Sequence, residues 1–229
     1  MGYPEHPETI ILKNKFYPKG LKEIDVWHYY QKNKSRILRE VNGKDLMLAI
    51  MVNINEPIMM RKGKSGSTIK LTNSNYDKII TGRTITIYST MKRYEDFGII
   101  DIDTDNWREA KLATINIYEE ILRAPFIFRD TLQIRFTGKT SFHIYCEFKR
   151  KTKIDSIRLL FSSYLKSKDL GSKYIVGGTR KKGLVNIDLS PNKYRGAYIT
   201  NRSLSIIGLR CMEVDVGDVL KFDPQKAKI

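Results

Sequence analysis

Residues 97–103 read FGIIDID, an apolar run that ends in two acidic residues, Asp101 and Asp103. Such a run is typical of a buried β-strand, and side chains two residues apart on a strand share one face, about 6.5–7 Å from each other. Two carboxylates held side by side repel each other, and a divalent metal ion is the usual positive partner for such a pair. The stretch therefore predicts a strand that carries a metal-binding acidic pair.

The composition favours a partner rich in phosphate. The 229 residues include 41 Lys+Arg and 25 Asp+Glu, which gives a formal net charge of +16. This excess favours nucleic acid as a partner, and a hydrophobic fraction of 41% is typical of a globular chain. No segment reads as a membrane span or a signal peptide, so we expect a soluble cytoplasmic protein with no membrane partner. Two cysteines are too few for a four-ligand zinc site.

Local patterns predict an α+β chain with two modules. We expect a helix over 21–41, strands over 46–52, 58–61 and 84–89, and then strands and helices over 98–103, 106–122, 132–136, 141–148, 155–166 and 184–189. From residue 97 to 190 the order is strand, helix, strand, strand, helix, strand, which predicts an RRM-like split βαβ sheet. We therefore expect an N-terminal α/β module over 1–90 and an RRM-like catalytic module over 91–229, packed as one compact unit. The polar tail after Asp218 is expected to be frayed.

Two further polar clusters lie on predicted strands. Ser141 and His143 are two residues apart, and Asp188 ends the last predicted strand. The first and third strands of a split βαβ sheet are its central pair, so Ser141 and His143 should neighbour the acidic pair. The fourth strand lies at an edge, so the approach of Asp188 is inferred from chemistry more than from topology. Three carboxylates can hold two divalent ions, and His143 and Ser141 could then donate hydrogen bonds to phosphate oxygens.

Each cluster alone also has a structural explanation. An Asp-x-Asp pair at a strand end often caps the following helix, and a lone histidine on a strand is usually structural. Asp188 could belong to the turn that follows it. The joint pattern of three clusters is more specific than any of its parts.

Taken together, the clusters resemble the motifs of the archaeo-eukaryotic primase superfamily, and most of all those of the polymerase domain of bacterial DNA ligase D. The first motif is IIDID at 99–103, the second GKTSFHIY at 138–145 and the third VNID at 185–188. Weaker likeness at 16–30 and 194–209 extends the resemblance over nearly the whole chain in fragments. Two departures stand out: residues 88–90 lack the histidine that ligase D polymerases carry before the first motif, and Thr140 stands where they have a lysine.

The resemblance implies a primase-polymerase fold and a template-dependent nucleotidyltransferase that adds NTPs or dNTPs to a strand by two-metal phosphoryl transfer. It implies that Asp101, Asp103 and Asp188 bind Mg²⁺ or Mn²⁺ as the catalytic metal ligands. The nucleotide's phosphates would be held by Ser141, His143, Lys139, Arg180, Lys181 and Arg202, and the nucleic-acid backbone by Lys19, Lys62 and Lys64. The expected partners are template and primer DNA, nucleoside triphosphates and proteins of replication or end joining.

Two other functions remain open at this point. A non-catalytic protein that binds single-stranded nucleic acid on an RRM-like sheet would fit the charge, but it would carry aromatic side chains on the sheet face. Here that face carries aspartates, which repel phosphate unless a metal ion is bound. A metal-dependent nuclease would explain the carboxylates but gives less purpose to Ser141, His143 and the arginines.

Overall fold

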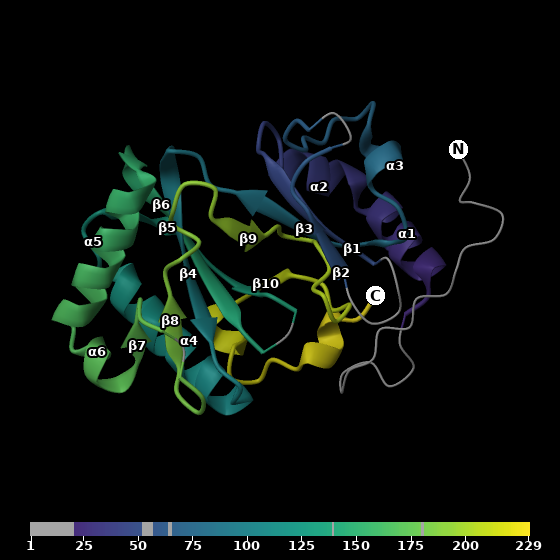
Figure 1. Ribbon diagram of the computed structural model, residues 1–229. Helices are drawn as coiled ribbons and strands as arrows, with labels where there is room; N and C mark the ends of the chain where they lie inside the picture. The colour runs from purple at the N-terminus through teal and green to yellow at the C-terminus, as the bar shows by residue number, and fades with distance from the viewer. Residues whose placement is uncertain (1–20, 52–56, 64–65, 139, 180) are drawn as a thin grey trace. The chain divides into compact units, whose positions relative to one another are not determined.

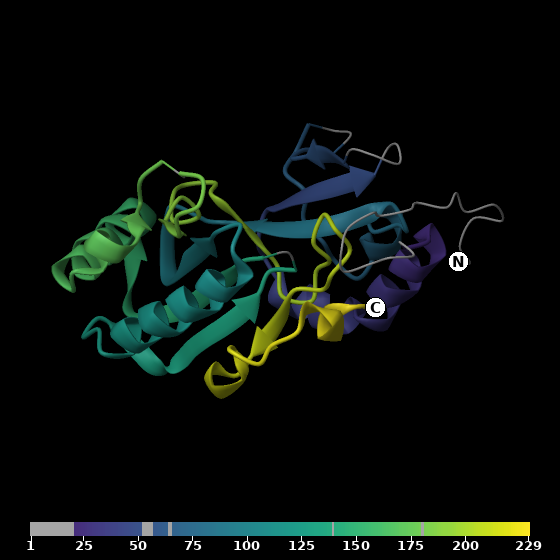
Figure 2. The same cartoon turned by 90° about the horizontal axis from the view of Figure 1, so that it is seen from below.

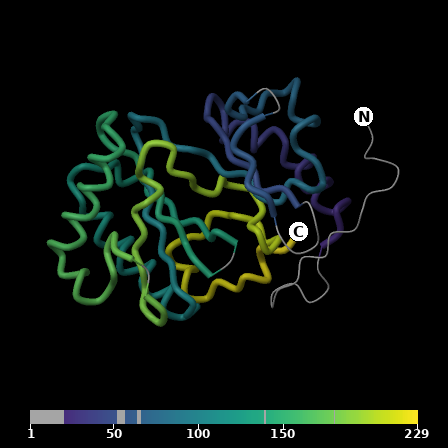
Figure 3. The backbone as a smooth tube through the Cα atoms, viewed as in Figure 1, coloured from purple at the N-terminus to yellow at the C-terminus, as the bar shows by residue number. Residues whose placement is uncertain are grey.

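The computed structural model describes residues 21–51, 57–63, 66–138, 140–179 and 181–229 (Figure 1). Its backbone divides into two compact units. Unit 1 consists of Met1–Thr90, Ile199–Met212 and Asp223–Ile229, and unit 2 of Met91–Tyr198 and Glu213–Phe222. The sequence predicted one module over 91–229. In the structure, two segments of that range, Ile199–Met212 and Asp223–Ile229, group with the N-terminal residues instead. Figure 3 traces the chain from the purple segments of unit 1, through teal and green in unit 2, to the yellow C-terminal segments.

Unit 1 is built on a four-stranded sheet. Its strands lie in the order β2 (Pro57–Met60), β1 (Leu46–Met51), β3 (Thr84–Thr90) and β9 (Ala197–Ile199), where the chain enters the unit. The helices are α1 (Glu23–Lys32), α2 (Lys34–Glu40) and α3 (Tyr76–Ile79), with a 3₁₀ turn over Pro224–Ala227. The helix predicted over 21–41 is thus two helices. Asn33, with a φ of −101° and a ψ of 5°, separates them, and its side-chain amide and its backbone N–H both donate to the Tyr29 carbonyl, at 2.9 and 3.1 Å.

Unit 2 contains the predicted RRM-like sheet. Its elements are β4 (Tyr94–Asp103), α4 (Trp107–Leu122), β5 (Ile127–Phe136), β6 (Phe142–Lys153), α5 (Ile154–Ser167), α6 (Leu170–Lys173), β7 (Ile175–Val176), β8 (Asn186–Asp188), β10 (Met212–Val214) and a 3₁₀ turn over Val216–Asp218. The strand order is β10-β5-β6-β4-β8-β7, with β4 antiparallel to both β6 and β8. The predicted α+β class is confirmed, as is the central pairing of β4 with β6.

Helices α4 and α5 pack on the same face of this sheet (Figure 2). Trp107 of α4 stacks on Phe142 of β6, with ring centroids 5.3 Å apart. Phe161 of α5 lies against Gly98 of β4, so closely that a Cβ at this position would be 2.5 Å from its ring. Because side chains alternate along a strand, Asp101 and His143 lie on the opposite face of the sheet. The helices therefore cover the apolar face and leave the acidic residues on the other one.

The C-terminal tail is packed, so the expectation of a frayed end after Asp218 is wrong. Val219 is fully buried, and Phe222 is only 4% exposed. The Phe222 ring lies 5.0 Å from that of Phe136 in β5, and Lys111 donates to the Leu220 carbonyl at 2.9 Å. Apolar contacts thus anchor a segment whose composition is mostly polar. Within the described ranges, no helix is long and apolar enough to cross a membrane.

Candidate active site

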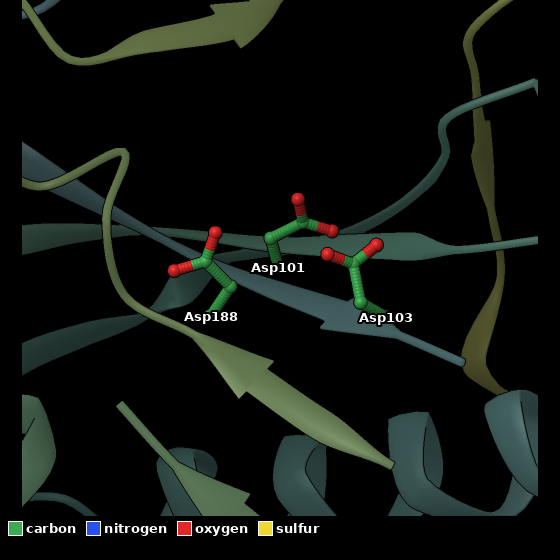
Figure 4. A group of neighbouring side chains, drawn as sticks. All are labelled: Asp101, Asp103 and Asp188. Atoms are coloured by element: carbon green, nitrogen blue, oxygen red, sulfur yellow. The ribbon is translucent and has the colours of Figure 1, made fainter. Parts of the chain in front are cut away.

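Strand pairing brings the three predicted carboxylates together. In the register of the sheet, Asp101 of β4 lies opposite His143 of β6 on one side and opposite Asp188 of β8 on the other. Asp103 lies two residues further along β4, on the same face. One carboxylate oxygen from each aspartate lies within 4.8 Å of the other two (Figure 4). The structure therefore unites the residues of the first and third motifs in one acidic cluster.

The position of β8 corrects one expectation. The strand of Asp188 was expected at an edge of the sheet, so the approach of Asp188 to the acidic pair was inferred from chemistry more than from topology. Instead, β8 lies between β4 and β7, and it pairs with the end of β4 that carries both aspartates. The approach of Asp188 thus follows from strand pairing as well as from chemistry.

Hydrogen bonds orient Asp188 and the segment that follows it. The backbone N–H and the hydroxyl of Ser190 donate to the two carboxylate oxygens of Asp188, each at 2.7 Å. The fully buried Asn192 then accepts from the Ile99 N–H at 2.9 Å and donates to the Ile99 carbonyl. Asn192 thereby continues the pairing with β4 beyond the end of β8. The turn after Asp188 is consequently tied to the strand of the acidic pair.

Asp101 has the surroundings of a metal ligand. One of its oxygens, Oδ2, lies 3.4 Å from Nε2 of His143, while the side chain is 19% exposed. The other oxygen, Oδ1, is buried without a hydrogen-bond partner in the part of the chain that the structure describes. Leaving a buried carboxylate oxygen unpaired is costly, and a bound cation would remove that cost. Since all ligand atoms of the cluster are carboxylate oxygens, they suit hard divalent ions such as Mg²⁺ or Mn²⁺.

Sequence reasoning missed Arg135, which extends this row of polar side chains. Arg135 of β5 lies opposite His143, so Arg135, His143, Asp101 and Asp188 line up across four neighbouring strands. The arginine is only 5% exposed, and its Nη2 donates to Gln133 at 2.9 Å. Its guanidinium also lies 4.7 Å from the centre of the Tyr145 ring. A buried cation so placed offsets part of the negative charge of the carboxylates.

The signal for Arg135 was present in the sequence. Residues 132–136 read LQIRF, in which Gln133 and Arg135 alternate with apolar residues. This alternation places both polar side chains on one face of the strand. The apolar residues identified the strand, but only the register with β6 shows that its polar face is the face of His143.

The other predicted site residues are not all placed together. Ser141 precedes β6, and its hydroxyl lies 2.7 Å from that of Thr137 across the turn between β5 and β6. Lys181 is exposed in the turn that leads to β8, and Lys62 and Arg202 belong to unit 1. Four predicted residues lie outside the described part of the chain: Lys19, Lys64, Lys139 and Arg180. Their predicted contacts with phosphate groups stay predictions.

Comparison with known proteins identifies the fold. No protein-family model matches the chain, and no curated protein matches its sequence significantly. Among solved structures, the polymerase domain of Mycobacterium tuberculosis ligase D, in complex with DNA, aligns with a TM-score of 0.74 and 14% identity over 96% of this chain and 89% of that one. The AEP domain of the cyanophage S-2L primase-polymerase aligns with a TM-score of 0.45 and 11% identity, over 85% and 92%.

The chain therefore has the primase-polymerase fold. The fold that the motif resemblance implies is thereby confirmed. The alignment with the ligase D polymerase domain spans nearly the whole of both chains, so the likeness extends well beyond the acidic cluster.

Proposed function

We propose that this protein is a template-dependent nucleotidyltransferase, a primase or polymerase that adds NTPs or dNTPs to a nucleic-acid strand. One observation carries the proposal: Asp101, Asp103 and Asp188 present carboxylate oxygens within 4.8 Å of one another on the sheet of a primase-polymerase fold. A cluster of this kind repels a triphosphate unless a cation is bound, and with a cation it suits metal-assisted chemistry on phosphates.

The three aspartates would hold Mg²⁺ or Mn²⁺. When bound, these ions neutralise charge on the triphosphate and promote ionisation of the attacking 3′-hydroxyl. Ser190 keeps the Asp188 carboxylate in place through its two hydrogen bonds. His143, whose Nε2 faces Asp101, would donate a hydrogen bond to a phosphate oxygen. Because phosphoryl transfer depends on positioning and electrostatics, this set of residues requires no separate catalytic base.

Further basic and polar residues would complete the nucleotide and strand sites. Ser141, Lys139, Arg180, Lys181 and Arg202 are proposed to contact the triphosphate, in keeping with the motif resemblance. Lys19, Lys62 and Lys64 are proposed to contact the phosphate backbone of template and primer DNA. The net charge of +16 supports binding to such polyanions. A place in replication or end joining, with the protein partners of either process, belongs to the same proposal.

The test is incorporation of labelled nucleotides on primed, gapped and unprimed templates with Mg²⁺ or Mn²⁺. We expect the wild type to extend a strand and Asp101→Asn to lose at least a hundredfold in rate, because one metal ligand is gone. The matched control is Asp96→Asn, which removes an exposed carboxylate from the same strand and should retain full activity. No incorporation by the wild type on any template would overturn the proposal. Strand cleavage in its place would identify a nuclease.

A further inference from the structure

Away from the carboxylates, unit 2 carries an exposed aromatic ring with two guanidinium groups close to it. Tyr194 is 52% exposed. The guanidinium carbon of Arg93 lies 6.0 Å from the centre of its ring, and that of Arg195 lies 5.3 Å away. Exposed aromatic rings accompanied by arginines are the groups with which proteins stack unpaired bases and hold the adjoining phosphates.

The backbone holds these three side chains together before any ligand binds. The Met91 N–H donates to the Gly196 carbonyl at 2.8 Å, and the Arg195 N–H donates back to the Met91 carbonyl at 3.0 Å. These bonds join the start of β4 to the turn that carries Tyr194. Arg195 has a φ of 60°, in the left-handed region that residues other than glycine seldom adopt. The surrounding hydrogen bonds thus hold Arg195 in an unfavourable backbone conformation next to Tyr194.

The surroundings of Tyr194 are strongly basic. We call these residues the Tyr194 patch: Lys92, Arg93, Lys153, Lys193, Tyr194 and Arg195. Lys153 belongs to it because its backbone lies opposite that of Tyr94 in the register of β4 and β6. All six side chains are exposed, and none of the five cations forms an ion pair within the described ranges. Of the carboxylates nearest in sequence, Glu95 is buried and accepts from the Lys92 N–H, while Asp96 and Asp155 are exposed and form no ion pair with these cations within the described ranges.

The patch and the acidic cluster are connected by the same two segments. The strand β4 begins at Tyr94, beside Arg93, and carries Asp101 about 23 Å further along, at 3.3 Å per residue. The chain that leaves Asp188 is fixed to β4 by Asn192 and then forms the turn with Tyr194. A strand of nucleic acid that ran along β4 from its first residues to the carboxylates would therefore begin next to the Tyr194 patch.

We propose that the Tyr194 patch binds an unpaired DNA strand, with a base stacked on Tyr194 and the neighbouring phosphates held by the basic side chains. The inference rests on the proposed function in one respect, that DNA is the substrate. An unpaired strand is favoured over a duplex because bases inside a duplex are already stacked and offer no free face. An acidic protein could use the charges but would have no particular need of the ring.

The test measures binding without chemistry. Fluorescence anisotropy with labelled dT20 in EDTA, without nucleotide, compares the wild type with Tyr194→Ala and Tyr194→Phe. Loss of one stacked base should weaken binding about 5- to 20-fold in Tyr194→Ala, whereas Tyr194→Phe keeps the ring and should stay within about twofold. A 20-base-pair duplex should bind Tyr194→Ala about as well as the wild type.

A second variant tests the charges. Arg195→Gly removes a guanidinium at a position whose φ suits glycine, so weaker binding cannot be attributed to misfolding. It should reduce the slope of log Kd against log salt concentration by about 0.7, the value for one phosphate contact on a single strand. The control Lys221→Gln removes an exposed charge outside the patch and should leave both affinity and slope unchanged.

Three results would overturn the inference. They are unchanged dT20 affinity in Tyr194→Ala, an equal loss on dT20 and duplex, and displacement of dT20 by polyglutamate as readily as by unlabelled dT20. Because the assay contains no metal ion or nucleotide, it is independent of catalysis. Normal binding by Tyr194→Ala in a protein that extends primers would refute the patch alone, while selective loss of binding in a protein without polymerase activity would refute only the proposed reaction.

Discussion

Mutual repulsion of the three carboxylates gives the sharpest prediction. If they form a metal site, they destabilise the metal-free protein, and replacing Asp103 by asparagine should relieve that strain. Two unit charges 4.8 Å apart repel by about 0.9 kcal/mol in water and about 3.5 kcal/mol at an effective dielectric constant of about 20. Asp103 takes part in two such pairs, and all three side chains are partly exposed. We therefore expect Asp103→Asn to raise the free energy of unfolding by about 1–3 kcal/mol without metal.

Added metal should reverse this order, so that the wild type becomes more stable than Asp103→Asn. A ligand at a hundred times its Kd stabilises the folded state by about 2.7 kcal/mol, and the wild type, with its full set of ligands, should gain more than the variant. The assay is urea denaturation followed by circular dichroism, in EDTA and in Mn²⁺. The control Asp96→Asn, on the same strand but outside the cluster, should change stability by less than about 0.5 kcal/mol in either condition. A loss of stability in Asp103→Asn without metal, or an equal gain from Mn²⁺ in both proteins, would refute the reasoning.

Three further predictions concern the site and its support. His143→Ala should raise KM for the nucleotide more than for the template, because the imidazole beside Asp101 is proposed to donate a hydrogen bond to a phosphate oxygen; an equal rise of both constants in steady-state kinetics would contradict this. Gly98→Ala should cost about 1–3 kcal/mol in urea denaturation, since the new Cβ would press on the Phe161 ring, and unchanged stability would mean that α5 moves freely. Asn192→Ala should cost about 1–3 kcal/mol and lower kcat, because it frees the Ile99 backbone and loosens the segment after Asp188; normal kcat in a folded variant would argue against this support.

Much of unit 2 could be predicted from sequence because its long elements have clear periodicity. The alternation around Asp101 and His143 identified two central strands and their shared face. The helix expected over 106–122 is α4, and the Asn106 side chain caps its start by accepting from two backbone N–H groups. The polar ends of β4 and β6, which extend to Tyr94 and Lys153, were not anticipated. They lack an apolar pattern and are held by their pairing with each other.

The remaining features depend on tertiary contacts that leave little trace in sequence. The strand β8 has only three residues, too few for periodicity, so the register that sets Asp188 opposite Asp101 could not be read. Arg135 was overlooked because burial of a cation depends on its neighbours Gln133 and Tyr145. The packed tail was missed because its few apolar residues form no periodic pattern. They are buried by contacts with aromatic side chains of the sheet and of α4, and the sequence does not show these contacts.

The central claim is that Asp101, Asp103 and Asp188 hold divalent metal for reaction with a nucleoside triphosphate. Its most direct test is Mn²⁺ binding at equilibrium, measured from the electron paramagnetic resonance signal of free Mn²⁺, for the wild type, Asp188→Asn and Asp96→Asn. The account predicts Mn²⁺ binding that tightens when a nucleoside triphosphate is added, persists in Asp96→Asn and falls at least tenfold in Asp188→Asn. Equal Mn²⁺ binding by all three proteins, with or without nucleotide, would contradict it.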